Sequence, residues 1–589
     1  MNWKAISIWT ALFVGLSFFF FSFATFLFAQ QEEMQLFIPE WSNLQSLLFR
    51  PGGLCHVAGL FCVQFYQNFV FASLFNSLLL TGIAYFTYQL LQQIARRGYN
   101  FLLFLFVVPF LFHFHTQWAY VVDGTIGLFF MLLLLYLSVF IDAKQITYGI
   151  LSTIFIYLLA GQLTVLYALL YVIFNWIRYK KTSIWLCLVV LIAVALSYAD
   201  VRYFLALPLT YGLYGESYHE TELQPDSYMY YVWIRFSILL FLLLVISCLL
   251  GRIDWKGKVK RILIFSLMSV LLFLFTGACL PRMEDVQNRM GDQLAYWSRQ
   301  HNWDAIIGMH YGKKIPFVLN RNYLNFALAQ KGVLANRLFF FDQYGPQGLL
   351  APYNRTYRMS LLLSDIHFLT GDISTSESYA MEALTLARRG GSPRALQRLV
   401  QINLLKGEWN LVEKYLSILS RMPNYRDWAV HYHSFMRRPD KIAAEPEFMG
   451  KQIGDYSSDK LLSQIDLTDL WTIHSDTAEI VNRTSLEYLG CSYLLAKKMN
   501  LFKALYLRIK DDPIWKPLPL HFQEAVLILS DEDPSLSNEG LDETVRRRYE
   551  AYKQASKQAL QFSDGLSMLY QQYGNSFWFY YQYKNMKNK

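Results

Sequence analysis

Three carboxylates beside apolar stretches are the residues of this sequence best placed for chemistry. Glu33 and Glu40 follow the first apolar run, and Asp123 precedes a later one. A carboxylate in such a place can act as a general base or bind a metal ion. No Asp-x-Asp motif lies near them. We assign no metal site to these residues and leave any cofactor and any dependence on a metal ion open.

Three arginines complement these carboxylates. Arg50 ends the first polar loop, and we expect Arg202 and Arg235 within a turn or two of the outer membrane boundary. Guanidinium groups bind phosphate oxygens through paired hydrogen bonds. We therefore predict that these arginines bind a lipid phosphate such as a diphosphate. A structural ion pair between Asp200 and Arg202 or Arg235 is the alternative interpretation.

The histidines and cysteines give weaker evidence of a functional site. His113 and His115 lie in the turn that leads to Asp123. Hydrogen bonding at the membrane interface is the simpler interpretation, and metal ligation is the alternative. The six cysteines form no CxxC pair and no zinc-ligand spacing, so we interpret them as small buried apolar residues.

Long apolar runs must position these side chains. The chain is 54% hydrophobic and 16% charged, too apolar for a soluble protein of 589 residues. The runs long enough to cross about 30 Å of hydrocarbon are Ala5–Ala29, Asn68–Leu91, Phe101–Ala119, Gly124–Ile141, Trp185–Leu207, Met229–Leu250 and Ile262–Leu280. The run Ile146–Ile177 is too long for one upright helix and breaks at Gly161, so we interpret it as two short helices. About nine spans are predicted in total.

The distribution of basic residues predicts the orientation of these spans. With a cytoplasmic N-terminus, the inner positions receive most of the basic residues of the first half, namely Lys4, Arg96, Arg97, Lys144, Arg178, Lys180, Lys181, Arg252, Lys256, Lys258, Lys260 and Arg261. An odd number of spans then places the C-terminal half outside. Because the basic excess is explained by orientation, the net charge of +9 does not indicate nucleic-acid binding.

Two domains follow from this division. Residues 1–280 are predicted to form a transmembrane domain with an outer interfacial loop at 30–53, and residues 281–589 an outer α-helical domain. In the loop, Trp41, Leu44 and Leu47 fall on one side of a short amphipathic helix, as expected for a segment lying on the bilayer surface. The predicted class is all-α: a polytopic transmembrane helix bundle followed by a soluble domain of helical hairpins.

The outer domain has a repeat-like pattern. Turns near His301, Gly332, Gly371 and Gly407 are spaced by roughly 31, 39 and 36 residues, which bracket the tetratricopeptide (TPR) period of about 34. We predict TPR-like hairpins, with Gly490 at a close contact between helices. Such hairpins leave a concave surface for a partner protein or a neighbouring domain; capping of the membrane domain is the alternative. The aromatic tail from Ser576 to Tyr583 is expected to pack on the last hairpins or on the bilayer interface.

The chain resembles an uncharacterised family of multi-pass membrane proteins from Bacteroidota. The resemblance rests on Glu33–Phe37, Arg50–Leu54, Asn322–Gly332 and Phe577–Tyr581. It implies a Gram-negative inner membrane and a periplasmic helical domain. It implies no activity and no catalytic residue.

The architecture is also similar, more loosely, to that of C-type glycosyltransferases. In that resemblance Glu32, Glu33 or Glu40 takes the acidic position of the first outer loop, and Asp123 a second one. The family commonly has Asp in that loop, whereas this loop contains only Glu. An architectural likeness alone does not establish function.

Two functions from different classes remain. The first is a transferase that moves a sugar from a polyprenyl-phosphate carrier at the outer leaflet to an acceptor. It predicts that Glu33, Glu40, Asp123, Arg202 and Arg235 converge on one cavity. The second is a membrane-anchored scaffold that recruits periplasmic envelope proteins through its hairpins. A transporter is disfavoured because the runs are largely apolar.

Overall fold

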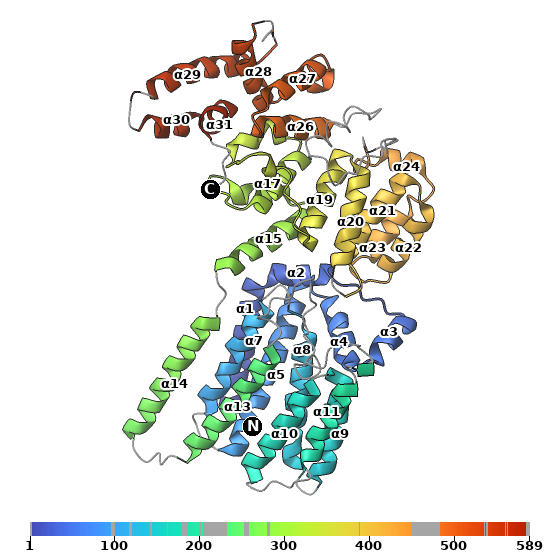
Figure 1. The fold of residues 1–589 in the computed structure, drawn as a ribbon, viewed down its shortest axis with the longest axis vertical. Helices are drawn as coiled ribbons and strands as arrows, with labels where there is room; N and C mark the ends of the chain where they lie inside the picture. Colours follow the sequence, from blue (N-terminus) through green and yellow to red (C-terminus); the bar gives the residue numbers. More distant parts are fainter. Residues whose placement is uncertain are drawn as a thin grey trace. The chain divides into compact units, whose positions relative to one another are not determined.

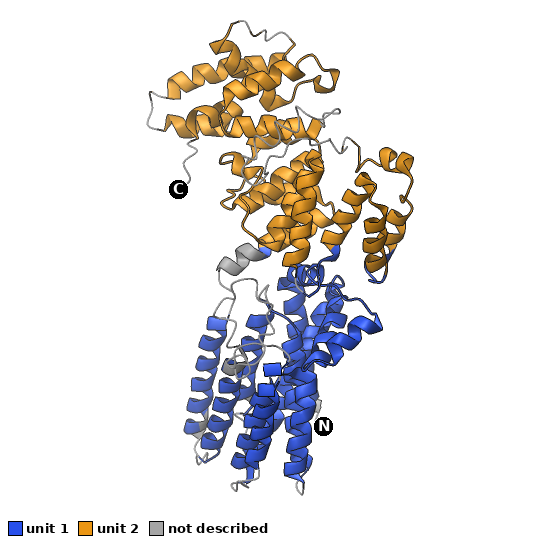
Figure 2. Ribbon diagram, turned by 45° about the vertical axis from the view of Figure 1, so that its right-hand side comes forward, with its two compact units in different colours: residues 1–289, 388–393, 421–426 blue, residues 290–387, 394–420, 427–589 orange. Residues whose placement is uncertain are grey.

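A computed structural model of the chain describes residues 3–95, 100–116, 120–141, 144–161, 163–179, 186–199, 202–203, 232–252, 258–279, 283–387, 389–449, 451, 483–534, 536, 540–559, 561 and 564–584. Within these ranges the regular elements are helices, and no β-strand occurs (Figure 1). The chain divides into two compact units (Figure 2). Unit 1 comprises residues 1–289, 388–393 and 421–426, and unit 2 comprises residues 290–387, 394–420 and 427–589.

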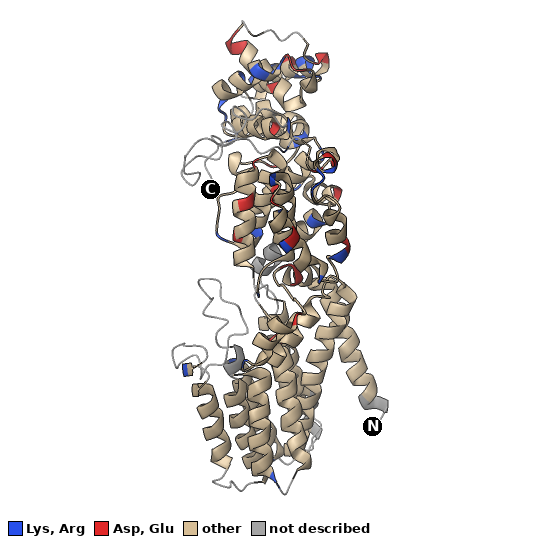
Figure 3. Cartoon of the chain, turned by 90° about the vertical axis from the view of Figure 1, so that its right-hand side faces the viewer, with Lys and Arg blue, Asp and Glu red and all other residues tan. Residues whose placement is uncertain are grey.

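Unit 1 is built from apolar helices that carry few charged residues (Figure 3). They are α1 (Trp3–Phe23), α2 (Thr25–Glu33), α3 (Trp41–Leu48), α4 (Gly53–Val63), α5 (Phe69–Ile94), α6 (Asn100–Leu103), η1 (Phe104–Phe106), α7 (Val107–His115), α8 (Asp123–Leu137), η2 (Ser138–Phe140), α9 (Gln145–Ala160), α10 (Leu163–Tyr179), α11 (Cys187–Ala199), α13 (Val232–Gly251) and α14 (Lys258–Cys279).

Four helical segments of unit 1 are long and apolar enough to cross a membrane: Ile6–Phe23, Phe69–Ile94, Asp123–Phe140 and Ile262–Cys279. Six shorter apolar helices accompany them. Several predicted runs correspond to shorter helices in the structure. For example, the 16 residues of α9 extend for about 24 Å, less than the roughly 30 Å of a hydrocarbon core. Length and composition therefore assign four candidate spans within the described residues.

Two glycine turns bring short helices of unit 1 into close contact. The predicted break at Gly161 is confirmed: α9 ends at Ala160, and Gly161 has a φ of 57°. Gly52, which precedes α4, has a φ of 79° and donates its N–H to the Tyr157 carbonyl at 3.2 Å. A Cβ on Gly52 would lie 3.2 Å from the Gly161 backbone nitrogen. This backbone packing fixes the start of α4 against the end of α9.

Unit 2 contains the more polar helices, with charged residues distributed along them (Figure 3). Helix α15 (Met283–Arg299) leads into it. The others are α16 (Trp303–His310), α17 (Val318–Gln330), α18 (Leu334–Arg337), η5 (Leu338–Phe340), η6 (Pro346–Gly348), α19 (Tyr357–Thr370), α20 (Ile373–Leu386), α21 (Pro393–Lys406), α22 (Trp409–Ser420), α23 (Arg426–His433), α24 (Pro439–Ala444), α26 (Arg483–Leu495), α27 (Met499–Ile509), η8 (Pro513–Trp515), α28 (Leu520–Glu532), α29 (Glu543–Ala559), α30 (Gly565–Tyr573) and α31 (Phe577–Tyr583).

Helical hairpins turn at the glycines that the sequence indicated. Gly371 separates α19 from α20 with a φ of 87°, and Gly407 separates α21 from α22 with a φ of 72°. Both lie in the left-handed region that favours glycine at the end of a helix. Ser364 and Ser376 each donate a hydroxyl to the other's carbonyl at 2.8 Å, and these small side chains let α19 and α20 approach closely.

The aromatic tail lies in the core of unit 2. Trp578 on α31 is fully buried and donates its indole N–H to the Glu524 carbonyl on α28 at 2.9 Å. Tyr580 donates its hydroxyl to the Leu495 carbonyl of α26 at 2.8 Å. Of the two predicted locations for the tail, the structure therefore shows packing on the last helices.

Gly490 on α26 provides a direct test of close helix packing. A Cβ there would lie 2.3 Å from the Phe522 ring, so something must shift. We expect Gly490→Ala to destabilise unit 2 by about 1–3 kcal/mol through overpacking. Gly308→Ala on α16 is the matched control, because a Cβ there meets nothing within 4 Å; it should stabilise by about 0.5–1 kcal/mol. Thermal unfolding followed by circular dichroism measures both, and equal effects would contradict the assignment.

Candidate functional site

Asp123 forms the centre of a buried charged cluster in unit 1. It is the first residue of α8 and is 1% exposed. Arg389 binds both carboxylate oxygens, with Nη1 at 3.0 Å from Oδ1 and Nη2 against Oδ2. His56 on α4 places Nδ1 at 3.0 Å from Oδ2. We call His56, Asp123 and Arg389 the Asp123 cluster.

Local backbone features explain this geometry. Gly59 lies almost one turn after His56 on α4, and a Cβ there would be 1.7 Å from Asp123 Oδ1, so the carboxylate occupies the space that glycine leaves. Arg389 has a φ of 52° and Gly390 a φ of 87°, which makes a tight left-handed turn. The same turn directs the Arg389 carbonyl to the Leu36 N–H at 3.2 Å.

The Asp123 cluster has a defined chemical capacity. With the carboxylate as acceptor, His56 carries its proton on Nδ1, which leaves Nε2 as the basic nitrogen. The His56 side chain is 32% exposed and that of Asp123 only 2%. A carboxylate that orients an imidazole in this way is the arrangement used in general acid–base catalysis. Arg389 compensates the charge of Asp123, so the carboxylate itself is held as an ion pair.

Glu32 on α2 anchors a second late segment of unit 1. Its Oε2 accepts hydrogen bonds from the Tyr425 hydroxyl and from the Gln67 amide, each at 3.0 Å. Asn424 donates its side-chain amide to the Gln64 carbonyl at 2.7 Å. Glu32 is 1% exposed, so these bonds lie inside unit 1. The segment 421–426 is therefore held through buried polar contacts.

Glu40 makes a more exposed contact with the same segment. It forms an ion pair with Arg421, and the two side chains are 46% and 41% exposed. Exposed pairs of this kind contribute about 0–1 kcal/mol to stability. The Glu40–Arg421 pair therefore helps to position segment 421–426 and contributes little to stability.

A series of hydrogen-bonded polar side chains lies buried between the helices near Asp123. His115 Nδ1 is 2.9 Å from Asn76 Oδ1, and its Nε2 is 2.7 Å from the Thr125 hydroxyl. Thr125 in turn contacts the Tyr120 hydroxyl at 2.5 Å, and the Asn76 amide donates to the Tyr66 hydroxyl at 2.9 Å. Both ring nitrogens of His115 are thus used in hydrogen bonds, which favours the structural interpretation of this histidine.

The remaining predicted residues occupy different surroundings. Glu33 is buried on α2, Arg50 is exposed after α3, Arg202 is exposed, and Arg235 is half-buried on α13. Asp200, the predicted alternative partner of Arg202 or Arg235, lies outside the described residues. Asp123 and Glu40 bind Arg389 and Arg421, two arginines outside the predicted set. The convergence of the whole set on one cavity stays a prediction.

The cation partners were missed by the sequence interpretation. His56 could have been noticed as a lone ionisable residue in the apolar stretch 53–63. Arg389 had a weaker signal, an Arg-Arg-Gly-Gly string between two helices. Neither pattern points to Asp123, which is 266 residues from Arg389 along the chain.

A small cavity adjoins the cluster, and no metal site accompanies it in the described residues. The cavity has a volume of about 30 Å³, room for about one water molecule. It is lined by Gln31, Met34, Gln35, Val63, Tyr120, Val121, Val122 and Arg389. Within the described ranges, no group of three or more His, Cys, Asp or Glu side chains is arranged to hold a metal ion. The cavity is therefore of water size and not of sugar size.

A further charged cluster lies in unit 2 around the Phe368 ring. The guanidinium carbon (Cζ) of Arg398 is 4.0 Å from the centroid of the Phe368 ring, and Lys451 Nζ is 4.6 Å from the same centroid. Arg394 and Arg398 bind opposite oxygens of Asp365 at 2.8 and 2.6 Å. Burial tends to raise the pKa of Asp365, but the two guanidinium groups hold it below its usual value. Burial, together with Arg398, lowers the pKa of Lys451 to about 8.

The lowered pKa of Lys451 predicts a pH dependence of stability. Between about pH 8 and 10.5 the unfolded chain binds this proton and the folded chain does not, so stability should rise with pH in that window. Below about pH 8 the buried ammonium of Lys451 lowers the free energy of unfolding by up to about 3 kcal/mol. We expect Lys451→Gln to stabilise unit 2 at pH 7 and to flatten this rise, measured by thermal unfolding at pH 7 to 10. Lys414→Gln, at an exposed position of α22, should change neither; a similar change in both variants would contradict the prediction.

Comparison with known proteins places the chain in a family without supplying an activity. Residues 1–584 match the family of unknown function DUF6057, and the chain belongs to that family. No curated protein and no solved structure matches the chain.

Proposed function

We propose that this member of the DUF6057 family is a membrane-anchored scaffold whose helical hairpins bind a partner protein. One observation carries the proposal: acidic residues of unit 1 are used to hold two late segments of the chain. Asp123 binds Arg389 of segment 388–393, and Glu32 binds Tyr425 of segment 421–426. Both carboxylates are thereby committed to structural contacts.

The chain connectivity gives these contacts their meaning. Segment 388–393 connects α20 to α21, and segment 421–426 connects α22 to α23. Each segment continues at both ends into hairpin helices of unit 2. Two late segments packed inside unit 1 are therefore each continuous in sequence with helices of unit 2, which is the connectivity expected of an anchored hairpin domain. Stacked hairpins bury their faces against one another and leave a surface for a partner.

The proposal extends to topology and location. The apolar helices of unit 1 form nine spans, the N-terminus is cytoplasmic, and the helical domain from residue 281 to 589 is periplasmic and TPR-like. The positive-inside bias supports this orientation, and the hairpin turns at Gly371 and Gly407 support the repeat register. The resemblance to a Bacteroidota family supports an inner membrane.

Exposed apolar residues on the hairpins provide the test. Leu411 on α22 is 38% exposed and Val430 on α23 is 65% exposed. Membranes carrying the full chain are treated with a cross-linker, and partner proteins are identified by mass spectrometry. A partner lost in the Leu411→Asp/Val430→Asp double variant supports the scaffold. The control is Ile514→Asp in η8, where the side chain is 59% exposed. Identical cross-links in all three proteins would contradict it.

A transferase is the second candidate, and one observation favours it. The imidazole of His56 is oriented by a buried carboxylate and remains partly exposed. In this proposal Nε2 takes the proton of an acceptor hydroxyl, whose oxygen bonds to the anomeric carbon of the sugar as the bond from that carbon to the phosphate oxygen breaks. Arg50, Arg202 and Arg235 bind the polyprenyl phosphate that leaves. Glu33, Glu40 and Asp123 supply the carboxylates.

Transfer of a radiolabelled sugar from a polyprenyl-phosphate donor, assayed in proteoliposomes, separates the two candidates. The transferase requires activity that His56→Gln abolishes, with His301→Gln in unit 2 as a control. A wild-type chain that transfers no sugar while retaining the hairpin-dependent partner supports the scaffold.

A further inference from the structure

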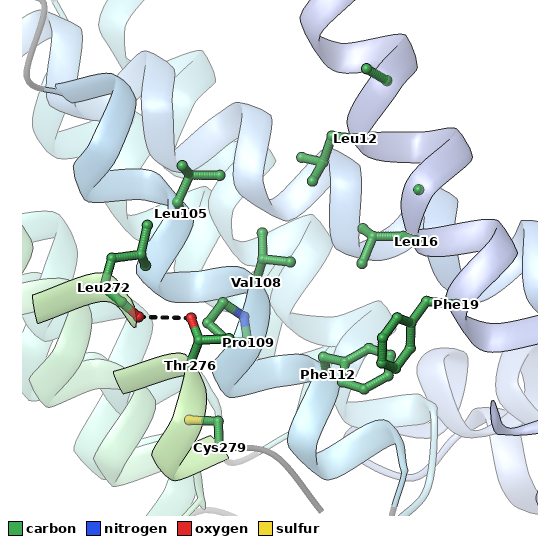
Figure 4. A pocket seen from close by; sticks show the side chains of 12 residues that line it. Leu12, Leu16, Phe19, Leu105, Val108, Pro109, Phe112, Leu272, Thr276 and Cys279 are labelled. Carbon is green, nitrogen blue, oxygen red and sulfur yellow. Dashed lines mark hydrogen bonds between the residues drawn. The ribbon is translucent and has the colours of Figure 1, made fainter. Parts of the chain in front are cut away.

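A cavity of about 390 Å³ lies among three apolar helices of unit 1. Figure 4 shows its side chains, which come from α1, from η1 and α7, and from α14. The lining consists of Ala11, Leu12, Gly15, Leu16, Phe19, Leu105, Val108, Pro109, Phe112, Leu272, Thr276 and Cys279. None of the residues discussed as catalytic or phosphate-binding lines it.

The lining offers almost nothing to a polar ligand. Its single hydroxyl, on Thr276, donates to the Leu272 carbonyl at 2.7 Å, a bond drawn in Figure 4. The other lining side chains are apolar or, at Cys279, a thiol. A water molecule needs two to four polar partners. The cavity is therefore suited to hydrocarbon and unsuited to water, sugar or phosphate.

Its size fits one lipid chain. An apolar cavity of about 150 Å³ accommodates the six carbon atoms of benzene, so 390 Å³ has room for roughly 15 carbon atoms. Two of its walls are segments of the candidate membrane spans Ile6–Phe23 and Ile262–Cys279. In a bilayer the surrounding medium is therefore hydrocarbon, and lipid acyl chains are the abundant molecules of the right chemistry and length.

We propose that this cavity is a binding site for one acyl chain of a membrane phospholipid. Transfer from bilayer to cavity removes no apolar surface from water, so the hydrophobic effect contributes little. The binding energy comes from van der Waals contacts that an empty cavity would forfeit. His113 on α7 donates Nδ1–H to the Cys279 carbonyl at 3.0 Å, which holds two walls together at one end of the site.

Two glycines in membrane helices give a matched pair of variants. A Cβ at Gly15 or at Gly277 meets nothing within 4 Å, so a larger side chain is accepted at either position without backbone strain. Gly15 lines the cavity and Gly277 does not. Gly15→Phe on α1 fills the cavity, whereas Gly277→Phe on α14 adds the same ring outside it.

The test uses the full chain in nanodiscs that contain a phospholipid with a photoreactive diazirine in its acyl chain. After illumination, mass spectrometry maps the cross-linked residues. We expect cross-links concentrated on residues 11–19 and 272–279, lost in Gly15→Phe and retained in Gly277→Phe. A thermal unfolding transition like that of the wild-type chain shows that the variants fold. If Gly15→Phe does not fold, Ala11→Leu replaces it.

Three results would overturn the assignment. Cross-links spread evenly along the apolar helices, or a pattern unchanged by Gly15→Phe, would show ordinary bilayer contact only. Loss of phospholipid cross-links when a small proportion of polyprenyl phosphate is added would show that the site prefers that lipid.

Discussion

Asp123→Ala is expected to destabilise unit 1 by about 3–5 kcal/mol, because it leaves the Arg389 guanidinium buried without its counter-charge. The Arg389 side chain is only 6% exposed, so bulk solvent does not screen the guanidinium that loses its carboxylate. His56 loses its hydrogen-bond acceptor in the same variant. The loss of folded protein on heating in detergent, followed by size-exclusion chromatography, measures the effect.

Glu40→Ala is the matched control for this prediction. It also removes a carboxylate bound to an arginine, but the Glu40–Arg421 pair is largely exposed. The expected change is about 0–1 kcal/mol. A second variant, Asp123→Leu/Arg389→Met, removes both charges and should recover much of the loss, since replacing a buried pair by apolar residues is often neutral. If Asp123→Ala lowered the stability no more than Glu40→Ala, the Asp123 cluster would not be a major source of the stability of unit 1.

Glu524→Ala is expected to have a comparable effect on unit 2. Glu524 and His521 are both fully buried, with Nδ1 at 2.8 Å from Oε2. The same oxygen accepts the Phe577 N–H at 2.8 Å, and His521 Nε2 accepts the Phe339 N–H at 3.2 Å. Truncation removes the acceptor for two buried donors, at a cost of about 1–3 kcal/mol for each unsatisfied group, and it opens a cavity as well.

The unfolding of unit 2 reports this second effect through circular dichroism and through the intrinsic tryptophan fluorescence, to which Trp578 on α31 contributes. Glu532→Ala is the control, because Glu532 ends the same helix at an exposed position. It should shift the transition little. Equal shifts for the two variants would show that the His521–Glu524 pair does not join α31 to α28 as strongly as its burial implies.

Local features of both units could be predicted from the sequence. Helix turns at Gly161, Gly371 and Gly407 were predicted because glycine populates the left-handed region at little cost, and all three have a positive φ. Gly490 was predicted at a close helix contact, which the adjacent Phe522 ring confirms. The apolar character of the first half likewise follows from composition alone.

The candidate site was less predictable, because its members are distant in the sequence. Asp123 and Glu40 were identified as notable acids, but their partners Arg389 and Arg421 lie 266 and 381 residues away along the chain. Periodicity and turn signals report contacts within a few turns of chain and say nothing about such pairs. The same limit applies to Glu32 and Tyr425, which are 393 residues apart.

Sequence by itself therefore determined an all-helical protein with an apolar first half, glycine turns at definite residues and a set of acids at the ends of apolar runs. Those properties depend on local backbone preference and on the apolar character of consecutive residues. Only the tertiary structure decided that Asp123 binds Arg389 and His56, that α31 lies in the core of unit 2, and that a hydrocarbon-sized cavity remains among α1, α7 and α14. The physical reason is that ion pairs, buried aromatic contacts and cavities depend on which distant helices pack together.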